Sequence, residues 1–377
     1  MADILIKGGT VLDPASGTET ERDVYFEDGV LSEAEPREGV LVIDATNAFV
    51  APGFVDLHTH VFNHSMFTNS RVSADRIGVR QGVACVVDAG SSGAITIDAF
   101  PENVHQTQAT QVFAFINIGS PGLPHLGVGH ASRPDLLDLD GVVKAFDRHA
   151  DWLVGVKVLA SQSHTGAFGL EAVKIARKAA SLVNKPLMLH VGNAPPLIDD
   201  VLDLLRPGDI VTHTYHGKIG GVLGYRDEVI APFKEAVKRG VVVDLGHGRS
   251  SFSFRVFETA MEQGMPLHCI SSDLHQGNVD RYAVSLARTM TKVRSLGFSL
   301  PEVVSRVSNL PAAAIGIDQY GFGSLVPGLA TTASIFRERE GEVELEDAEG
   351  SIRQSRSFIE PIGCVVNGEF FSVQEPL

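Results

Sequence analysis

Residues 53–60 read GFVDLHTH, a short apolar run that starts at a glycine and ends in two histidines separated by one residue. The run is too short for a typical helix and suits a strand buried on both faces. Seven similar runs follow along the chain, at residues 82–90, 111–119, 153–161, 186–192, 208–217, 240–248 and 267–275. We therefore predict eight buried strands.

Segments between these runs carry apolar residues at helical spacing, as at residues 170–183, 227–239 and 252–263. Buried strands that alternate with helices indicate a parallel sheet, and eight such units predict closure into a barrel. An open doubly wound sheet is the alternative, but no GxGxxG or GxxxxGK(S/T) loop follows any of the strands. The predicted fold class is α/β, a (β/α)8 TIM barrel over residues 53–323.

The two ends of the chain differ from the middle. Residues 2–50 and 325–377 alternate apolar and polar positions, with turn residues every eight to ten positions or so. This pattern is typical of antiparallel strands with one solvated face. We expect the ends, residues 1–52 and 324–377, to pair into one small β-sandwich domain beside the barrel.

Composition narrows the classes of function. The 377 residues are 44% apolar and carry a net charge of -15, which disfavours binding to nucleic acid or to an anionic membrane surface. The three cysteines form no CxxC pair, so neither a disulfide framework nor a thiolate zinc site is expected. The sequence shows no secretory signal and no apolar stretch of membrane-spanning length, and we expect a cytoplasmic protein.

Candidate metal ligands gather at the carboxyl ends of the predicted strands, where a barrel of this class carries its site. Residues i and i+2 of a strand point to the same side, so His58 and His60 can bind one cation together. One such pair is a weak signal, but later strands add further candidates at equivalent heights. These are Lys157, His190, His213 and Asp273.

Lys157 is the unusual member, because its run, LVGVKVLA, would bury an ammonium group. That burial costs several kcal/mol unless the charge is paired or neutralised. One solution is reaction of the neutral amine with CO2 to a carbamate, which would give an anionic bridge between two metal ions. The other is a salt bridge from Lys157 to Asp273.

Residues 51–60, APGFVDLHTH, resemble the signature of the amidohydrolase superfamily, and residues 323–328, GSLVPG, resemble its return into the sandwich. The resemblance implies two divalent ions per chain, with zinc expected. It places one ion on His58, His60 and Asp273 and a more exposed ion on His190 and His213. It also implies that carboxylated Lys157 bridges the two ions.

The resemblance also implies a reaction, the hydrolysis of an amide or ester. In the family mechanism a hydroxide that bridges the ions attacks the acyl carbonyl, and Asp273 passes the proton to the leaving group. The sequence is most similar to the dihydroorotase-like deacetylase branch. We expect a deacetylase or acyl esterase that acts on a small N-acyl or O-acyl carboxylic acid.

Two alternatives remain: a cyclic amidase of the dihydroorotase or hydantoinase type, and a non-catalytic scaffold. Dihydroorotases carry an arginine two residues after the second histidine, and this chain has Phe62 there. The scaffold is disfavoured because all six ligand positions are filled. The expected partner is the small acyl substrate. Whether the chain also forms a homo-oligomer is left open.

Four residues that follow the strands are candidates for contact with the substrate. Arg249, after the seventh run, is the expected partner of the substrate carboxylate, although a helix cap or a pair with Glu258 would also explain it. Three other residues are candidates too, and for His125 an inert surface loop is the alternative. These are Tyr215 and His216, which follow His213, and His125, in the long loop after the third run.

Overall fold

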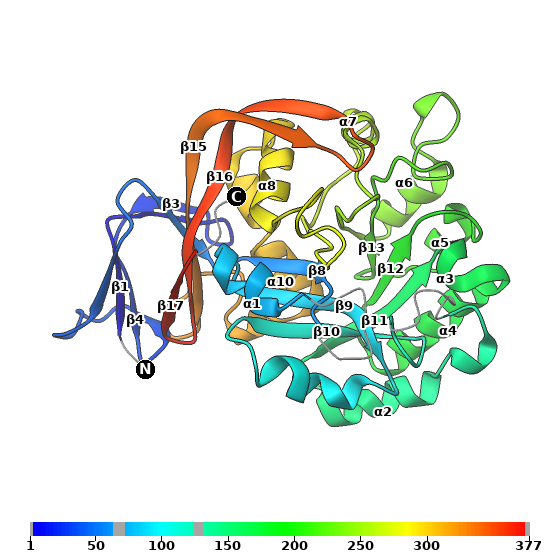
Figure 1. The fold of residues 1–377 in the computed structure, drawn as a ribbon, viewed down its shortest axis with the longest axis horizontal. Coiled ribbons are helices and arrows are strands. Elements are labelled where there is room, and N and C mark those ends of the chain that lie inside the picture. The colour runs from blue at the N-terminus through cyan, green and yellow to red at the C-terminus, as the bar shows by residue number, and fades with distance from the viewer. Residues whose placement is uncertain (1–2, 63–71, 124–130, 374–377) are drawn as a thin grey trace.

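A curled parallel sheet forms the centre of the molecule (Figure 1). The computed structural model describes residues 3–62, 72–123 and 131–373. In these ranges seven parallel strands lie in the order β14-β13-β12-β11-β10-β9-β8. They are β8 (Val55–Thr59), β9 (Cys85–Gly93), β10 (Gln111–Asn117), β11 (Leu153–Ala160), β12 (Leu187–Val191), β13 (Ile210–Thr212) and β14 (Val242–Val243).

Residues 267–275, the predicted eighth strand, join the two edges of this sheet. Thr59 forms a parallel bridge with Leu274, and Asp244 forms one with Cys269. Backbone hydrogen bonds accompany both bridges, from His60 N to Leu274 O (2.9 Å) and from Leu245 N to Cys269 O (3.0 Å). The segment therefore connects β8 with the chain beyond β14 through single bridges instead of a continuous ladder.

The last strands are shorter than predicted because the backbone leaves the β conformation within the predicted runs. His213 has a φ of 64° and Asp273 a φ of 51°, and Gly246 and Gly248 are also left-handed. A residue in this region cannot continue a strand ladder. The expected strand at 208–217 therefore ends directly before His213, and the run at 240–248 cannot continue as a strand through Gly246 and Gly248.

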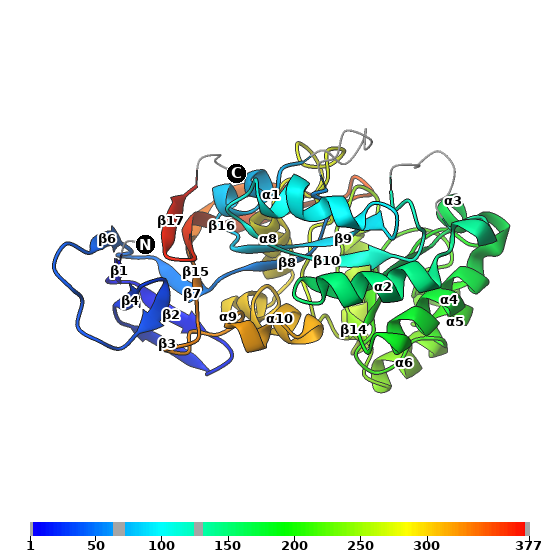
Figure 2. The same cartoon turned by 90° about the horizontal axis from the view of Figure 1, so that it is seen from below.

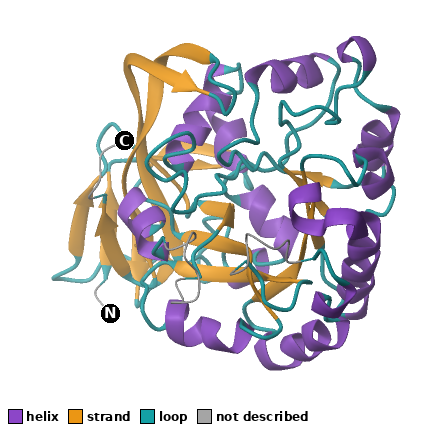
Figure 3. Ribbon diagram, turned by 45° about the vertical axis from the view of Figure 1, so that its right-hand side comes forward, coloured by secondary structure: helices purple, strands orange, loops and turns teal. Residues whose placement is uncertain are grey.

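Helices cover the outer face of the sheet (Figures 2 and 3). The predicted helices at 170–183, 227–239 and 252–263 correspond to α4 (Gly169–Leu182), α6 (Ala231–Lys238) and α7 (Phe254–Glu262). None of the helices in the described ranges is long and apolar enough to cross a membrane. The others are α1 (Ala74–Ile77), α2 (Leu139–His149), α3 (Gln162–Thr165), α5 (Ile198–Leu202), α8 (Leu286–Ser295), α9 (Leu300–Ser305) and α10 (Asn309–Ile315).

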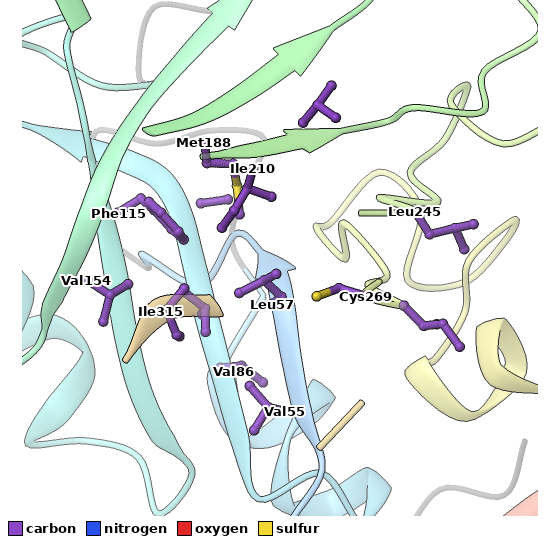
Figure 4. Close-up of a cluster of buried hydrophobic side chains, with 14 of the residues drawn as sticks. Val55, Leu57, Val86, Phe115, Val154, Met188, Ile210, Leu245, Cys269 and Ile315 are labelled. Atoms are coloured by element: carbon purple, nitrogen blue, oxygen red, sulfur yellow. The ribbon is translucent and has the colours of Figure 1, made fainter. Parts of the chain in front are cut away.

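Buried apolar side chains from the strands of the curled sheet, from the segments after β14 and at 267–275, and from α10 form the core beneath the site. Figure 4 shows ten of them labelled: Val55, Leu57, Val86, Phe115, Val154, Met188, Ile210, Leu245, Cys269 and Ile315. All three cysteines of the chain are buried and free, in line with the expected lack of a disulfide framework.

Strands from the two chain ends pair with each other, as predicted. A four-stranded sheet holds β1 (Ile4–Lys7), β4 (Val24–Glu27), β5 (Val30–Ser32) and β6 (Leu41–Asp44). A six-stranded sheet holds β2 (Thr10–Asp13), β3 (Thr18–Glu21), β7 (Phe49–Pro52), β15 (Thr332–Glu346), β16 (Ile352–Val366) and β17 (Glu369–Ser372). One apolar cluster contains buried residues of both sheets, among them Phe26, Val50 and Ile335.

Strands β15 and β16 extend beyond this sheet as a long hairpin, and we call residues 337–360 the hairpin arm. In Figure 1 the arm passes from the end sheets over α8 to α7. Ile359 N donates to Thr291 Oγ1 of α8 (3.1 Å), and at the tip Asp347 Oδ2 accepts from Phe254 N (2.9 Å). The C-terminal segment therefore contacts the central unit as well as the end sheets.

Candidate metal centre

All six predicted metal ligands line one cavity of about 160 Å³ at the carboxyl ends of the strands. They come from β8 and the residue that follows it, from β11 and β12, from the residue that follows β13, and from the segment that joins the sheet edges. Four other residues complete the lining: Leu123, Leu159, His164 and His275. The topology thus brings together side chains that lie more than 200 positions apart in the sequence.

His58, His60 and Asp273 form the tightest group. One donor atom from each lies within 4.8 Å of the others, a spacing suited to a single metal ion. Asp273 Oδ1 lies 3.1 Å from His60 Nε2 and 3.4 Å from His58 Nε2. Two imidazoles and a carboxylate make a donor set that suits a divalent ion such as zinc.

His190 and His213 lie beside this group. Their ring centroids are 4.3 Å apart, and the rings of His58 and His213 are 4.9 Å apart. His213 Nε2 lies 3.9 Å from Asp273 Oδ2, the carboxylate oxygen that does not face His58 and His60. Asp273 therefore stands between the two groups of histidines.

Hydrogen bonds beneath the cavity select the tautomers of two histidines. Thr212 Oγ1 donates its proton to Asp244 Oδ2 (2.6 Å), so it accepts from His58 Nδ1 (2.9 Å). His213 Nδ1 donates to the carbonyl oxygen of Gly246 (2.6 Å). Each ring therefore keeps the lone pair of its Nε2 for a ligand, the arrangement expected of a histidine that binds metal.

The protonation states also suit metal binding. Burial lowers the pKa of His58 and His190 well below its ordinary value and lowers the pKa of His213 to about 3. The three rings are therefore neutral at pH 7, and the neutral imidazole is the form that coordinates a metal ion.

Lys157 is completely buried, and its Nζ lies 3.3 Å from His58 Nε2 and 3.3 Å from Met188 Sδ. In the described part of the chain no carboxylate lies within 4 Å of this Nζ, so the predicted alternative of a salt bridge to Asp273 is not formed. Burial lowers the pKa of Lys157 to about 7, which gives the side chain a substantial neutral fraction near pH 7.

The expectation that Tyr215 contacts substrate is corrected by its position. Tyr215 has no exposed surface, its ring packs edge-on against Phe257 (5.1 Å), and its hydroxyl donates to the carbonyl of Pro266. It turns away from the cavity because the left-handed His213 bends the chain just before it. Tyr215 is a core residue.

His216 is also buried, but it borders a second hollow, of about 460 Å³, which shares no lining residue with the metal cavity. Its Nδ1 accepts from Lys218 N (3.2 Å), and burial lowers the pKa of the ring to about 4. The neutral ring therefore carries its proton on Nε2, for which the described residues offer no acceptor.

Arg249 is exposed at the mouth, next to Gly248. Gly248 packs so closely on Asp273 Oδ2 that an added Cβ would lie 2.6 Å away. Burial lowers the pKa of His275, and the nearby Arg249 charge lowers it further, which places Arg249 on the His275 side of the cavity. Glu258, its suggested alternative partner, pairs with Arg353.

Two further observations concern the expected substrate contacts. His125, like His130 in the same loop, lies outside the described residues. Phe62, at the position where dihydroorotases carry an arginine, is completely buried and stacks on Phe100 (5.2 Å).

Sequence reasoning missed one residue of the cavity, His275. His275 lines the cavity, and the i, i+2 rule that paired His58 with His60 would also have paired it with Asp273.

Comparisons with known proteins agree with this geometry. A protein named deacetylase from Agrobacterium fabrum is 33% identical over 332 residues, 87% of this chain and 80% of that one. A deacetylase from Enterococcus faecalis is 34% identical over 331 residues, 86% of each chain. No family model matches the chain.

Two crystal structures have the same fold along the whole chain. One, described as a dihydroorotase, has a TM-score of 0.92 and 30% identity and covers 100% of this chain and 99% of its own. The other, described as an adenine deaminase, has a TM-score of 0.90 and 30% identity and covers 99% and 100%. The fold and the histidine-lined cavity define a metal-dependent hydrolase. The chain belongs to the amidohydrolase superfamily, in its dihydroorotase-like deacetylase branch.

Proposed function

We propose that the protein is a metal-dependent deacylase that hydrolyses the amide or ester bond of a small N-acyl or O-acyl carboxylic acid. The observation that carries the proposal is the cluster of His58, His60 and Asp273 beside His190 and His213 in one buried cavity. The identity to two deacetylases over most of the chain supports the reaction class.

The donor set suits two divalent ions, and we assign zinc to both. His58, His60 and Asp273 would hold one ion, His190 and His213 the other, and Lys157 would bridge them as a carbamate. The pKa of Lys157, about 7, supports this modification, because only the neutral amine reacts with CO2. Bound ions of this kind polarise an acyl carbonyl and lower the pKa of a bound water.

Asp273 is the residue we assign to proton transfer. Its two oxygens face different histidines, so one can remain with the His58 and His60 group while the other faces the cavity. The carboxylate can accept a proton from the attacking water and release it to the departing amine or alkoxide. Gly248, which packs against this carboxylate, restricts its movement.

A cyclic amidase remains the second candidate, because the dihydroorotase structure is 30% identical over the whole chain. Phe62 disfavours this candidate. The side chain at the position of the dihydroorotase arginine is apolar and packed on Phe100, so it cannot bind a ring carboxylate.

Two further proposals concern the organisation of the protein and its location. We propose a barrel domain at residues 53–323 and a β-sandwich domain at 1–52 and 324–377, supported by the pairing of β7 with β15. We also propose a cytoplasmic location, supported by three free, buried cysteines.

A substrate panel on metal-loaded protein tests the function. It contains N-acetyl amino acids, O-acetyl hydroxy acids, dihydroorotate and hydantoin. We expect the best linear acyl acid to exceed dihydroorotate in kcat/KM by about a hundredfold or more, the contribution of one charged hydrogen bond. Equal or faster turnover of dihydroorotate would favour the cyclic amidase.

A further inference from the structure

Lys292 of α8 is a second lysine that is completely buried. Its Nζ lies 2.7 Å from His247 Nε2 and donates to the carbonyl oxygen of Tyr282 (2.8 Å). Among the residues that the structure describes, no carboxylate forms an ion pair with this amine. A buried cation without a counter-charge is costly, and an apolar side chain could fill the same space without that cost. The two hydrogen bonds therefore distinguish Lys292 from an apolar residue.

The contact with His247 depends on where its ring carries a proton. His247 Nδ1 lies 2.9 Å from the carbonyl oxygen of Gly248, and a carbonyl can only accept, so Nδ1 carries a proton. Burial lowers the pKa of His247 well below its ordinary value, and the charge of Lys292 lowers it further, so the ring is neutral near pH 7. His247 Nε2 is then the acceptor for Lys292. A chain of hydrogen bonds thus runs from Lys292 through the imidazole to the Gly248 backbone.

Gly248 connects this chain to the candidate metal centre. Its φ of 56° is left-handed, and an added Cβ would lie 2.6 Å from Asp273 Oδ2. His247 N donates to the carbonyl oxygen of Ser271 (3.1 Å). Gly248 N donates to that of Ser272, directly before Asp273 (3.0 Å). The loop after β14 therefore lies against both the carboxylate of Asp273 and the backbone that leads into it.

The second hydrogen bond of Lys292 reaches the segment on the other side of Asp273. Tyr282, which accepts this bond, has a left-handed φ of 69°, and Val284 N nearby donates to the carbonyl oxygen of Asn278 (3.3 Å). Asn278 Nδ2 in turn donates to the carbonyl oxygen of Asp273 (2.8 Å). One side chain thus connects the loop after β14 with the segment after Asp273.

We propose that Lys292 is a positioning residue that, through His247 and Gly248, holds the Asp273 carboxylate in the orientation required for proton transfer. The inference rests on the proposed deacylase function, in which Asp273 moves the proton. Lys292 does not line the cavity, so it acts only through other residues. Its effect lies in the placement of Asp273 Oδ2, the oxygen 3.9 Å from His213 Nε2, because a small misplacement of a reacting group lowers the rate strongly.

Kinetics of the metal-loaded protein with the best linear acyl acid of the panel test the proposal. We expect Lys292→Met to lower kcat about tenfold to a hundredfold, with KM changed less than about twofold and the metal content unchanged. His247→Phe, which removes the same contact, should cause a similar loss, and the double variant should lose no more than either single variant. Thr291→Val is the matched control on α8. It removes the hydrogen bond from Ile359 N of the hairpin arm to the neighbouring buried residue, and kcat should not change.

An unchanged kcat in Lys292→Met and His247→Phe, a loss confined to KM, a loss of metal, or additive losses in the double variant would each overturn the proposal. Crystal structures of the metal-loaded parent and Lys292→Met separate it from the proposed function, because they do not depend on turnover. If the parent hydrolyses no acyl acid of the panel, the deacylase function fails, but a displaced Gly248 and a turned Asp273 carboxylate in the variant would still support the positioning role. The same orientation in both structures would refute it. If Lys292→Met does not fold, His247→Phe takes its place in each comparison.

Discussion

Lys157 has the most demanding environment of any residue in the cavity, because its amine is buried against an imidazole and a thioether. We expect Lys157→Ala to reduce the metal content from about two ions per chain to one or fewer and to abolish turnover. Metal analysis after desalting, with Lys178→Ala as a control, measures this. Unmodified Nζ in the electron density of fully metallated, active protein would contradict the carbamate.

The protonation of Lys157 predicts a pH dependence for metal uptake. Below its pKa of about 7 the neutral amine, and with it the capacity to form a carbamate, decreases about tenfold per pH unit. Reconstitution of the metal-free protein with zinc and bicarbonate should therefore be slow at pH 6 and fast at pH 8. Equal rates at the two pH values, with and without bicarbonate, would show that no carbamate forms.

The metal centre could be predicted from the sequence because each ligand is a polar residue at the end of an apolar run. The substrate contacts could not be predicted in the same way. Tyr215 follows His213 by two positions, yet the left-handed backbone at His213 sends it into the core. The loop after β13 contacts a hairpin more than 100 residues away, where Gly217 packs against Glu349, and no local pattern encodes this contact.

At the scale of elements, Asp56 of β8 joins its strand to the segment that closes the sheet. Its Oδ1 accepts from Ser272 N (3.0 Å), its Oδ2 accepts from the Ser272 hydroxyl, and the side chain is completely buried. We expect Asp56→Ala to lower the free energy of unfolding by about 2–4 kcal/mol, because these two buried donors and His58 N, which also donates to Oδ1 (3.3 Å), lose their acceptor. Urea denaturation measures this loss.

Asp56→Asn is the matched control, since an amide can still pair with Ser272, and its loss should be smaller. The free energy of unfolding should also depend on pH differently in the parent and in Asp56→Asn. Burial raises the pKa of Asp56 to about 7, so the folded state retains a proton that the unfolded chain loses near pH 4. This term makes the parent less stable as pH rises from about 4 to 7. If the free energy of unfolding of Asp56→Asn fell with pH as steeply as that of the parent, Asp56 would not titrate in this way.

The sequence predicted the presence and order of the strands and helices better than it predicted their lengths. Strands β9 to β12 match their apolar runs closely, because continuous burial gives both faces of a strand the same pattern. Strand β14 covers two residues where nine were expected. Beyond it only an isolated bridge from Asp244 to Cys269 continues the pairing, and left-handed glycines follow at 246 and 248, whose backbone angles an apolar run does not reveal.

For the whole molecule, metal binding should be linked to thermal stability. The cavity lies where strands of the curled sheet converge, so ions bound there contact residues from five separate segments. Removal of the ions by a chelator should lower the Tm by about 5 °C or more, and zinc should restore it, because ligands that bind only the folded state stabilise it. A chelated protein that has lost its ions but keeps its Tm would contradict the predicted linkage.

The pairing of β7 with β15 has a consequence for how the chain folds during synthesis. Strand β7 can pair with β2 on one edge as soon as it is made, but Ala51 lies opposite Ser334, so its other edge gains a partner only after some 280 further residues have left the ribosome. The edge that β7 will present to β15 is unpaired throughout that time, and such edges promote aggregation. A molecular chaperone that shields this edge in the nascent chain would therefore raise the yield of native protein more than one that acts after release.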